Sequence, residues 1–359
     1  MRTKLYSEVR CTQFAALTPY LVPAALRSKK VVNLGDGFIL RAIERLLGQF
    51  SATRVFSPRL TPTADVISVL EQCPAVILAG ANQLTDSYTV WPGLTAARIR
   101  GGTLRLVPFG IGLHGSPAQT LKLSDETREI LEAVHTRIEY SSWRCPRTVA
   151  FLRREVPSLA SRFLMTGCPV LYDRPLLESS RFDSAERTVA VTATERQDFW
   201  AQETGVIDLV ARRFSRARRF FVTHQNSSPP RACEEIRHRL MGWNPEGMTD
   251  RVEGLRLYAR KRGFEIVIPR DADECLQFYD RVDVHVGSRL HAHLLFLSRN
   301  KRSYLVPIDG RSSGMIEHLG FPAGSPEELD TLWDFDFERV RERARESFVT
   351  MERFVSSLS

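Results

Sequence analysis

Apolar positions along the chain fall into two kinds of run, one of strand length and one with helical spacing. "PAVILAG" (74–80) and "TLRLVPFGIG" (103–112) are short apolar runs that end at glycine. In residues 39–50 the apolar side chains recur at the spacing of one helix face: Ile39, Ile43, Leu46, Leu47 and Phe50. Runs of the two kinds alternate from end to end, which is typical of an α/β protein.

The second half repeats this alternation. It predicts strands at 187–194, 218–225, 264–270, 283–287 and 303–308, and helices at 232–243, 255–263, 271–282, 288–299 and 325–334. A charged amphipathic helix is expected over 336–358, and a polar loop over 309–314. Ser124 and Ser325 are expected to cap helices, because each precedes acids at a helix start.

The boundary between two domains is expected near residues 172–186, which combine proline, serines and mixed charge. This division gives an N-terminal α/β domain over 1–180 and a C-terminal one over 181–359. The fold class predicted is α/β, with two facing Rossmann-like domains, parallel sheets and a closing C-terminal helix, a GT-B-like arrangement. Ligands are then expected in the cleft, at the carboxyl ends of the strands.

The composition narrows the function classes. The net charge of +8 fits a nucleic-acid partner or a site for a phosphorylated, acidic substrate. The arginine-rich run at 211–221 has no nucleic-acid motif beside it, so no nucleic-acid partner is expected.

Six cysteines without a C-x-x-C spacing argue against a disulfide framework and a structural zinc site. No apolar run has bilayer length, and the first residues lack a signal-peptide core, so a cytoplasmic protein is expected.

Two stretches carry the strongest candidates for chemistry. Arg289 and His291 stand where a strand turns into a helix, and exposed backbone N–H groups there favour an anion. His293 is expected to be a packing or capping histidine. Asn33, Gly35 and Asp36 lie in a glycine-rich turn before another helix, where an anion or a simple N-cap by Asp36 explains the residues equally well.

Two weaker candidates follow. Arg144 comes after a strand and before a helix, and it is a ligand for an anion or an ordinary surface arginine. The loop with Arg311, Ser312 and Ser313 is an anion nest or a solvated loop.

Several of these stretches match one known family. "DVHVGSRLHAHLLFL" (283–297), followed by "YLVPI", resembles the carboxyl-terminal signature of the polysaccharide pyruvyl transferase family. "VVNLGDGFILRAI" is similar to its Asn-x-Gly-Asp turn, "FGIGLHG" to its Gly-Ile-Gly loop, "WRCPRTVAFL" to its Arg-Asp-x-x-Ser/Thr segment and "MTGCPV" to its Gly-Asp-Pro step. The chain departs from the pattern at Cys145 and Cys168, where the family has Asp, and at 77–86, where it often has glycines.

The resemblance implies an enzyme that moves the pyruvyl group of phosphoenolpyruvate onto two hydroxyls of a sugar or lipid-linked glycan in cell-surface polysaccharide biosynthesis. It implies catalytic roles for His291, Arg289 and Asp36, and substrate binding by Arg144, Asn33, Gly35, Ser312 and Ser313. We expect no metal and no cofactor beyond the donor substrate, since arginines supply the positive charge. A lipid-linked acceptor would place the protein peripherally at the inner membrane face.

Two other functions share these features. One is a nucleotide-sugar-dependent glycosyltransferase of GT-B type, and the other is a non-catalytic, anion-binding member of the family.

Overall fold

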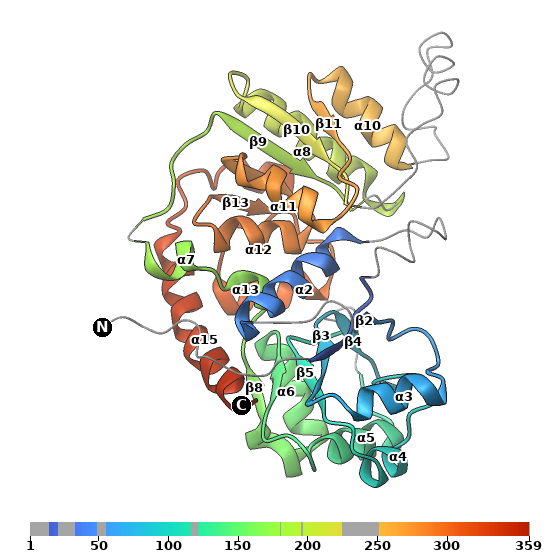
Figure 1. The fold of residues 1–359 in the computed structure, drawn as a ribbon. Coiled ribbons are helices and arrows are strands. Elements are labelled where there is room, and N and C mark those ends of the chain that lie inside the picture. Colours follow the sequence, from blue (N-terminus) through green and yellow to red (C-terminus); the bar gives the residue numbers. More distant parts are fainter. Residues whose placement is uncertain are drawn as a thin grey trace.

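The computed structural model describes residues 14–20, 33–48, 55–115, 121–179, 181–194, 197–224 and 251–358. These residues form two α/β lobes, each built on a parallel sheet and drawn one above the other in Figure 1. The predicted helix at 232–243 lies outside the described residues, as do Cys11 and Cys233.

The N-terminal lobe is built on a four-stranded sheet with the order β2-β1-β3-β5. Every pairing in it is parallel, with Ile77 opposite Ala16 on one side and Val107 on the other. Its strands are β1 (Ala15–Leu17), β2 (Val55–Phe56), β3 (Val76–Ala79) and β5 (Leu106–Phe109), and its helices are α2 (Leu34–Leu47), α3 (Ala64–Glu71), α4 (Ala96–Gly101), α5 (Asp125–Val134), α6 (Pro146–Glu155) and α7 (Arg174–Glu178).

Two small parallel sheets extend this lobe at the carboxyl ends of its strands. One pairs β4 (Asn82–Leu84) with β6 (Gly112–Leu113), and the other pairs β7 (Ser141–Trp143) with β8 (Phe163–Met165). A bridge between Ile111 and Trp143 joins the two. Short 3₁₀ turns η1 (Pro157–Arg162) and η2 (Pro169–Leu171) flank β8.

The C-terminal lobe has a five-stranded parallel sheet with the order β11-β10-β9-β12-β13. Its strands are β9 (Thr188–Thr192), β10 (Arg218–Val222), β11 (Glu265–Val267), β12 (Val284–Gly287) and β13 (Ser303–Leu305). Its helical elements are η3 (Gln197–Phe199), α8 (Trp200–Arg213), α10 (Arg251–Lys261), α11 (Ala272–Asp280), α12 (Leu290–Ser298), α13 (Gly310–Leu319), α14 (Pro326–Leu329) and α15 (Glu338–Ser356). Strands such as β3 and β12 are buried along their whole length, as expected where helices cover both faces of a parallel sheet.

Helix α2 joins the two lobes, although it follows the first strand of the N-terminal sheet (Figure 1). The backbone N–H of Leu34 donates to the carbonyl of His224 at 3.0 Å. On the next turns, Arg41 Nε donates to Asp273 Oδ1 at 2.7 Å. The start of α2 is therefore held against the carboxyl end of a C-terminal strand.

Helix α15 crosses back from the C-terminal lobe to the N-terminal one (Figure 1). The ring of Phe354 packs edge-on to Phe109 at 4.9 Å, and the Tyr172 hydroxyl donates to Ser347 Oγ at 2.8 Å. The predicted fold class is confirmed: two facing α/β domains, parallel sheets and a closing C-terminal helix. The boundary at residues 180 and 181 stays a prediction, because α2 and α15 each pack on both lobes.

Two helix starts were predicted correctly from their N-cap residues, and two others were predicted wrongly. Ser124 and Ser325 cap α5 and α14, the latter through a capping box. Helix α2 begins at Leu34 and not at Ile39, because the Asn33 side chain accepts from the Gly35 N–H; Asn33, not Asp36, is the N-cap. Residues 310–319 form α13 instead of a loop up to Gly314, because Asp309 caps them.

Candidate functional site

A cleft of about 980 Å³ opens between the two lobes. Its N-terminal side carries Asn33, Asp36 and residues 81–83, 85 and 87–92, and its C-terminal side carries residues 307–311 and Ser313. Residues 307–313 follow β13 and residues 81–83 follow β3, so the cleft lies at the carboxyl ends of parallel strands, as expected for open α/β sheets.

Asp36 lies in the first turn of α2 and lines this cleft. Burial raises the pKa of its carboxyl to about 6, against the opposing effects of Arg311, Arg59 and Arg144 and of a hydrogen bond with Asn33. A carboxyl that titrates near neutral pH suits a general acid or base. Asn33 serves twice here, since it also caps the helix that carries Asp36.

Arg144 follows β7 and is only 2% exposed. Its Nη1 donates to His291 Nε2 at 3.4 Å, and its Nη2 donates to Asn82 Oδ1. Gly112 leaves the space for the guanidinium, because a Cβ at that position would lie 2.8 Å from Arg144 Nε. Burial lowers the pKa of Arg144, which means that its positive charge is under-compensated in the protein.

A small cavity of about 40 Å³ lies against Arg144. Its walls share Asn82, His114 and Arg311 with the large cleft. The guanidinium therefore borders space that adjoins the cleft.

His291 is in the first turn of α12 and is 6% exposed. A Cβ on Gly35 would lie 2.8 Å from His291 Nδ1, so Gly35 permits the two helix starts to approach each other. Burial holds the pKa of His291 well below its usual range, and Arg144, Arg311 and Arg289 lower it further. The imidazole is therefore neutral, and an arriving anion would favour its protonation.

The geometry brings Asn33, Gly35 and Asp36 at the start of α2 together with Arg144 and His291, which lie far from them in the sequence. The family model for polysaccharide pyruvyl transferase matches residues 33–310, from the cap of α2 to the start of α13. The chain belongs to the polysaccharide pyruvyl transferase family. It is accordingly a transferase, and its family places it in polysaccharide biosynthesis or modification.

Solved structures similar to this family member have low sequence identity. One is the S. aureus MnaA–UDP co-structure (TM-score 0.47, 11% identity, 96% of this chain and 95% of that chain). Others are the wall teichoic acid polymerase TagF (0.39, 10%, 97% and 85%) and accessory secretory protein 1,2 and 3 of Streptococcus pneumoniae (0.41, 11%, 69% and 46%). This chain thus spans less than half of the streptococcal structure. No curated protein sequence matches it.

Arg289, the first residue of the family's Arg-Leu-His element here, is the N-cap residue of α12 and is half-buried. Its Nε donates to the carbonyl of Ala193 at 2.6 Å, and its Nη2 to that of Thr194 at 3.1 Å. The side chain thus ties the start of α12 to the end of β9, and Arg289 is not among the residues that line the cleft. Its catalytic role stays a prediction.

The two candidate serines lie just beyond the residues that the family model matches, in the first turn of α13. Ser313 lines the cleft, whereas Ser312 is 1% exposed and its Oγ has no partner among the described residues. Asp309 accepts from the N–H groups of Arg311 and Ser312, and also from Arg311 Nε at 2.7 Å. Arg311 is therefore held at the edge of the cleft.

Sequence reasoning missed Asn82 and Arg59, and it named Arg311 in a possible anion nest without giving it a substrate-binding role. Asn82 belongs to the segment 77–86, where the chain departs from the family's glycine run, and that segment supplies the acceptor for Arg144. Its signal was a polar residue directly after the apolar strand at 74–80. Arg59 follows β2 by a few residues and had no local signal.

His293 has the packing role that the sequence predicts for it. Its Nδ1 pairs with Ser303 Oγ at 2.8 Å, and its ring lies 4.2 Å from that of Phe321. Across the parts of the chain that the structure describes, no group of three His, Cys, Asp or Glu side chains is arranged to hold a metal ion. Within the same residues, no helix has the length and apolar character to span a membrane.

Proposed function

We propose that this chain transfers the pyruvyl group of phosphoenolpyruvate to two hydroxyls of a sugar, forming a cyclic ketal and releasing phosphate. One observation carries the proposal: Asp36, with a pKa of about 6, lines a cleft in which Arg311 and Arg59 also stand, and Arg144 borders the adjoining cavity. A titrating carboxyl beside several guanidinium groups fits a reaction that moves protons on an anionic substrate.

The donor carries a phosphate and a carboxylate, so its site must be cationic. In the proposal Arg144 and Arg311 bind these anionic groups, with Ser313 beside them. Arg289 and His291 complete the positive side, as the family's Arg-Leu-His element implies. Arg144 suits this role because, within the part of the chain that the structure describes, its buried guanidinium donates hydrogen bonds to neutral groups, Asn82 and His291.

The proposed chemistry needs two proton transfers before the first intermediate forms. The methylene carbon of the donor gains a proton, and one acceptor hydroxyl attacks the adjacent carbon while Asp36 takes the hydroxyl proton. His291 is the candidate acid, because the negative charge of a bound donor offsets the neighbouring arginines and raises its pKa.

Ring closure completes the balance. The carbon–oxygen bond to phosphate breaks, the second hydroxyl attacks the same carbon, and its proton leaves with phosphate. The proton that Asp36 took from the first hydroxyl replaces the one that His291 gave to the methylene carbon. Positive charge near the leaving oxygen stabilises the developing phosphate. One proton thus ends on the new methyl group and one on the released phosphate.

The acceptor in this proposal is a sugar or a lipid-linked glycan. A cytoplasmic location, peripheral to the inner membrane face when the acceptor is lipid-linked, stays a prediction.

Calorimetric titration with phosphoenolpyruvate tests the proposal. We expect the wild-type protein to bind the donor, and His291→Ala to lose binding and phosphate release with a thermal melt close to that of wild type. Arg289→Ala should lose the same activities and also melt lower, because its side chain ties α12 to β9. Tight binding of a nucleoside diphosphate with no binding of phosphoenolpyruvate would instead indicate a glycosyltransferase. Collapse of the fold in both variants would assign the two residues a structural role, and Arg144→Gln then tests the donor site independently.

A further inference from the structure

One side of the cleft differs in character from the corner that holds Asp36 and Arg144. It is formed by the segment between β4 and α4, which contributes Gln83, Thr85, Ser87, Tyr88, Thr89, Val90 and Trp91 to the lining. We call these residues the neutral wall, because none of them carries a charge at neutral pH. Hydroxyl and amide groups dominate its polar atoms.

The neutral wall contains a strained turn. Val90 has a φ of 65°, a conformation that a β-branched residue rarely adopts. The Trp91 N–H donates to the carbonyl of Thr89 at 2.6 Å, so residues 89–91 form a three-residue γ-turn. Such strain is retained where the surrounding structure enforces it, and it is concentrated at functional sites.

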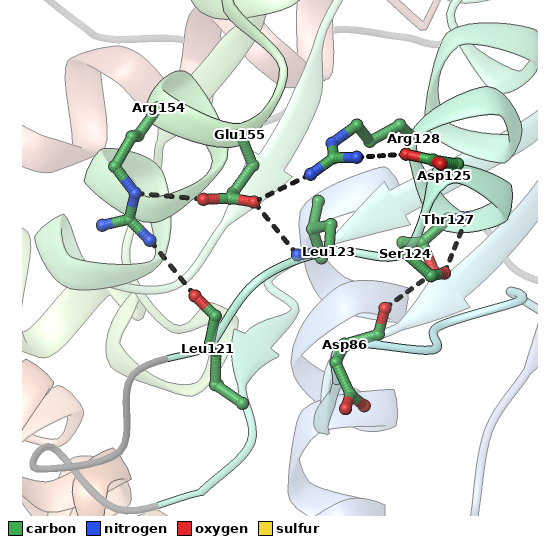
Figure 2. Close-up of polar contacts among 9 residues, drawn as sticks. All are labelled: Asp86, Leu121, Leu123, Ser124, Asp125, Thr127, Arg128, Arg154 and Glu155. Atoms are coloured by element: carbon green, nitrogen blue, oxygen red, sulfur yellow. Dashed lines mark hydrogen bonds and ion pairs between the residues drawn. The ribbon is translucent and has the colours of Figure 1, made fainter.

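Contacts at both ends of the segment hold this turn in its strained conformation. Trp91 Nε1 donates to the carbonyl of Ser57 at 3.0 Å, and the Trp91 ring packs beside Phe56. At the other end, the carbonyl of Asp86 accepts from the Ser124 N–H at 2.8 Å and from Thr127 Oγ1 at 3.1 Å; Figure 2 shows these residues together. The wall is therefore a preorganised surface.

Two residues of the wall that line the cleft, Tyr88 and Thr89, carry hydroxyl groups. Tyr88 is 6% exposed, and its hydroxyl is buried without a partner among the residues that the structure describes. An unsatisfied buried hydroxyl is unfavourable for folding, so its presence beside the cleft needs another reason. Thr89 is half-buried, lines the cleft and supplies a second hydroxyl.

The size of the cleft leaves room for a second substrate. Pockets that enclose a whole drug-sized ligand measure about 300–1,000 Å³, and this cleft is at the upper end of that range. Phosphoenolpyruvate, a three-carbon enol phosphate, is much smaller and needs cations, which the neutral wall lacks.

We propose that the neutral wall is the acceptor subsite, and that it binds an uncharged, hydroxyl-rich sugar ring through Tyr88 and Thr89. The inference rests on the proposed function, since it assigns the acceptor half of that site. Sugar hydroxyls are both donors and acceptors, and hydroxyl side chains match them in both roles. The rigid turn fixes the position of the wall within the cleft that Asp36 also lines.

Saturation-transfer NMR with p-nitrophenyl glycosides of galactose, glucose, mannose and N-acetylmannosamine tests this subsite. We expect at least one glycoside to bind the wild-type protein. Tyr88→Phe and Thr89→Val, which remove one hydroxyl each at nearly constant shape, should each weaken it about fivefold to tenfold. Tyr88→Phe should also melt no lower than wild type, because it removes an unsatisfied buried group, and a merely structural tyrosine would behave in the opposite way.

Two controls separate this inference from the function on which it rests. Tyr258→Phe removes a hydroxyl that pairs with Asp208 outside the cleft, and it should leave glycoside binding unchanged. Arg144→Ala should lose phosphoenolpyruvate binding, measured by phosphorus NMR, and should keep glycoside binding.

Wall variants that bind the glycoside like wild type, or a wild-type protein that binds none of the four glycosides, would overturn the subsite. A wild-type protein that binds glycosides and no phosphoenolpyruvate would overturn the donor assignment alone.

Discussion

Asp36 and Glu155 are two partly buried carboxyl groups in the N-terminal half of the chain, and their surroundings shift their pKa values in opposite directions. Burial raises the pKa of Asp36 to about 6, and the neighbouring arginines only partly offset it. Burial also acts on Glu155, but hydrogen bonds from the Leu123 N–H, Arg154 and Arg128 outweigh it and lower the pKa.

The contacts explain the difference. Figure 2 shows Glu155 between two arginines, with Leu123 N–H to Oε2 at 3.0 Å and Arg154 Nε to Oε1 at 3.0 Å. The Glu155 cluster, which we define as Leu123, Arg128, Arg154 and Glu155, satisfies its carboxylate and adjoins the Ser124 contact that anchors the neutral wall. The Asp36 corner leaves its charges less compensated. One carboxylate is thus satisfied by contacts within the fold, whereas the other keeps a raised pKa in the cleft where we propose that the donor binds.

The largest effect is expected when the Arg144 guanidinium, the cation near Asp36, is removed. Arg144→Ala should lower the rate of phosphate release from phosphoenolpyruvate about 100- to 1,000-fold, the usual loss when one preorganised charge is removed. The melting temperature should not fall, because the guanidinium is buried and its hydrogen bonds to described residues go to the neutral side chains of Asn82 and His291. Arg144→Lys should restore little, since an ammonium group cannot reproduce the contacts with both Asn82 and His291. A Lys variant with wild-type rates would contradict a directional role for the guanidinium.

The second-largest effect on the reaction rate is expected from substitution of Asp36. Asp36 must be ionised to accept a proton, so kcat/KM should rise as the pH increases through about 6 and then level off. Asp36→Asn should reduce the rate about a hundredfold and remove this limb of the pH profile. The same profile in both proteins would assign the titration to another group.

Asp36→Asn should also change stability with a definite sign. The folded-state pKa is raised from 3.8 to about 6, so ionisation of Asp36 destabilises the fold as the pH rises through this range. The Asn variant should be more stable than wild type by about 1–3 kcal/mol at high pH, since one pKa unit corresponds to about 1.4 kcal/mol. Urea unfolding should show the gain vanish below about pH 4.

A third, smaller effect is expected on the stability of the Glu155 cluster, and its pH dependence should be opposite to that of Asp36. Glu155→Gln should lower the free energy of unfolding by about 1–2 kcal/mol at neutral pH, because charge-assisted hydrogen bonds are weakened. The folded-state pKa is depressed, so the stabilisation is present above the ordinary value of 4.5 and is lost as the pH falls through the folded-state pKa. Equal stability of the two proteins at neutral pH would contradict this account, and phosphate release should stay near the wild-type rate.

The smallest effect comes from an ion pair between the lobes. Arg147 Nε donates to Glu317 Oε2 at 2.7 Å, joining α6 to α13, but both side chains are more than 40% exposed. Arg147→Ala should change stability by less than about 0.5 kcal/mol, because exposed pairs contribute little. A loss several times larger, measured by urea unfolding, would show that the pair holds the two lobes together.

The sequence by itself determined the features that depend on neighbouring residues. The alternation of runs gave α/β lobes with parallel sheets, and Ser124 and Ser325 marked two helix starts. The position of Arg289 and His291 at the start of α12 was also predicted from "VGSRLHAHLL", since a strand, a glycine and an apolar helix follow one another there. Caps and periodicity act over a few residues, which is why local patterns report them.

Only the tertiary structure decided which of these residues meet. Asp36, Arg144 and His291 come from α2, the end of β7 and α12, and they converge because α2 docks on the C-terminal lobe and because Gly35 and Gly112 leave room for the side chains. The strained turn at Val90 and the pairing of Asn82 with Arg144 are equally invisible in the sequence. These features depend on contacts between residues distant in the chain, and the packing of two lobes, not local preference, sets their energies.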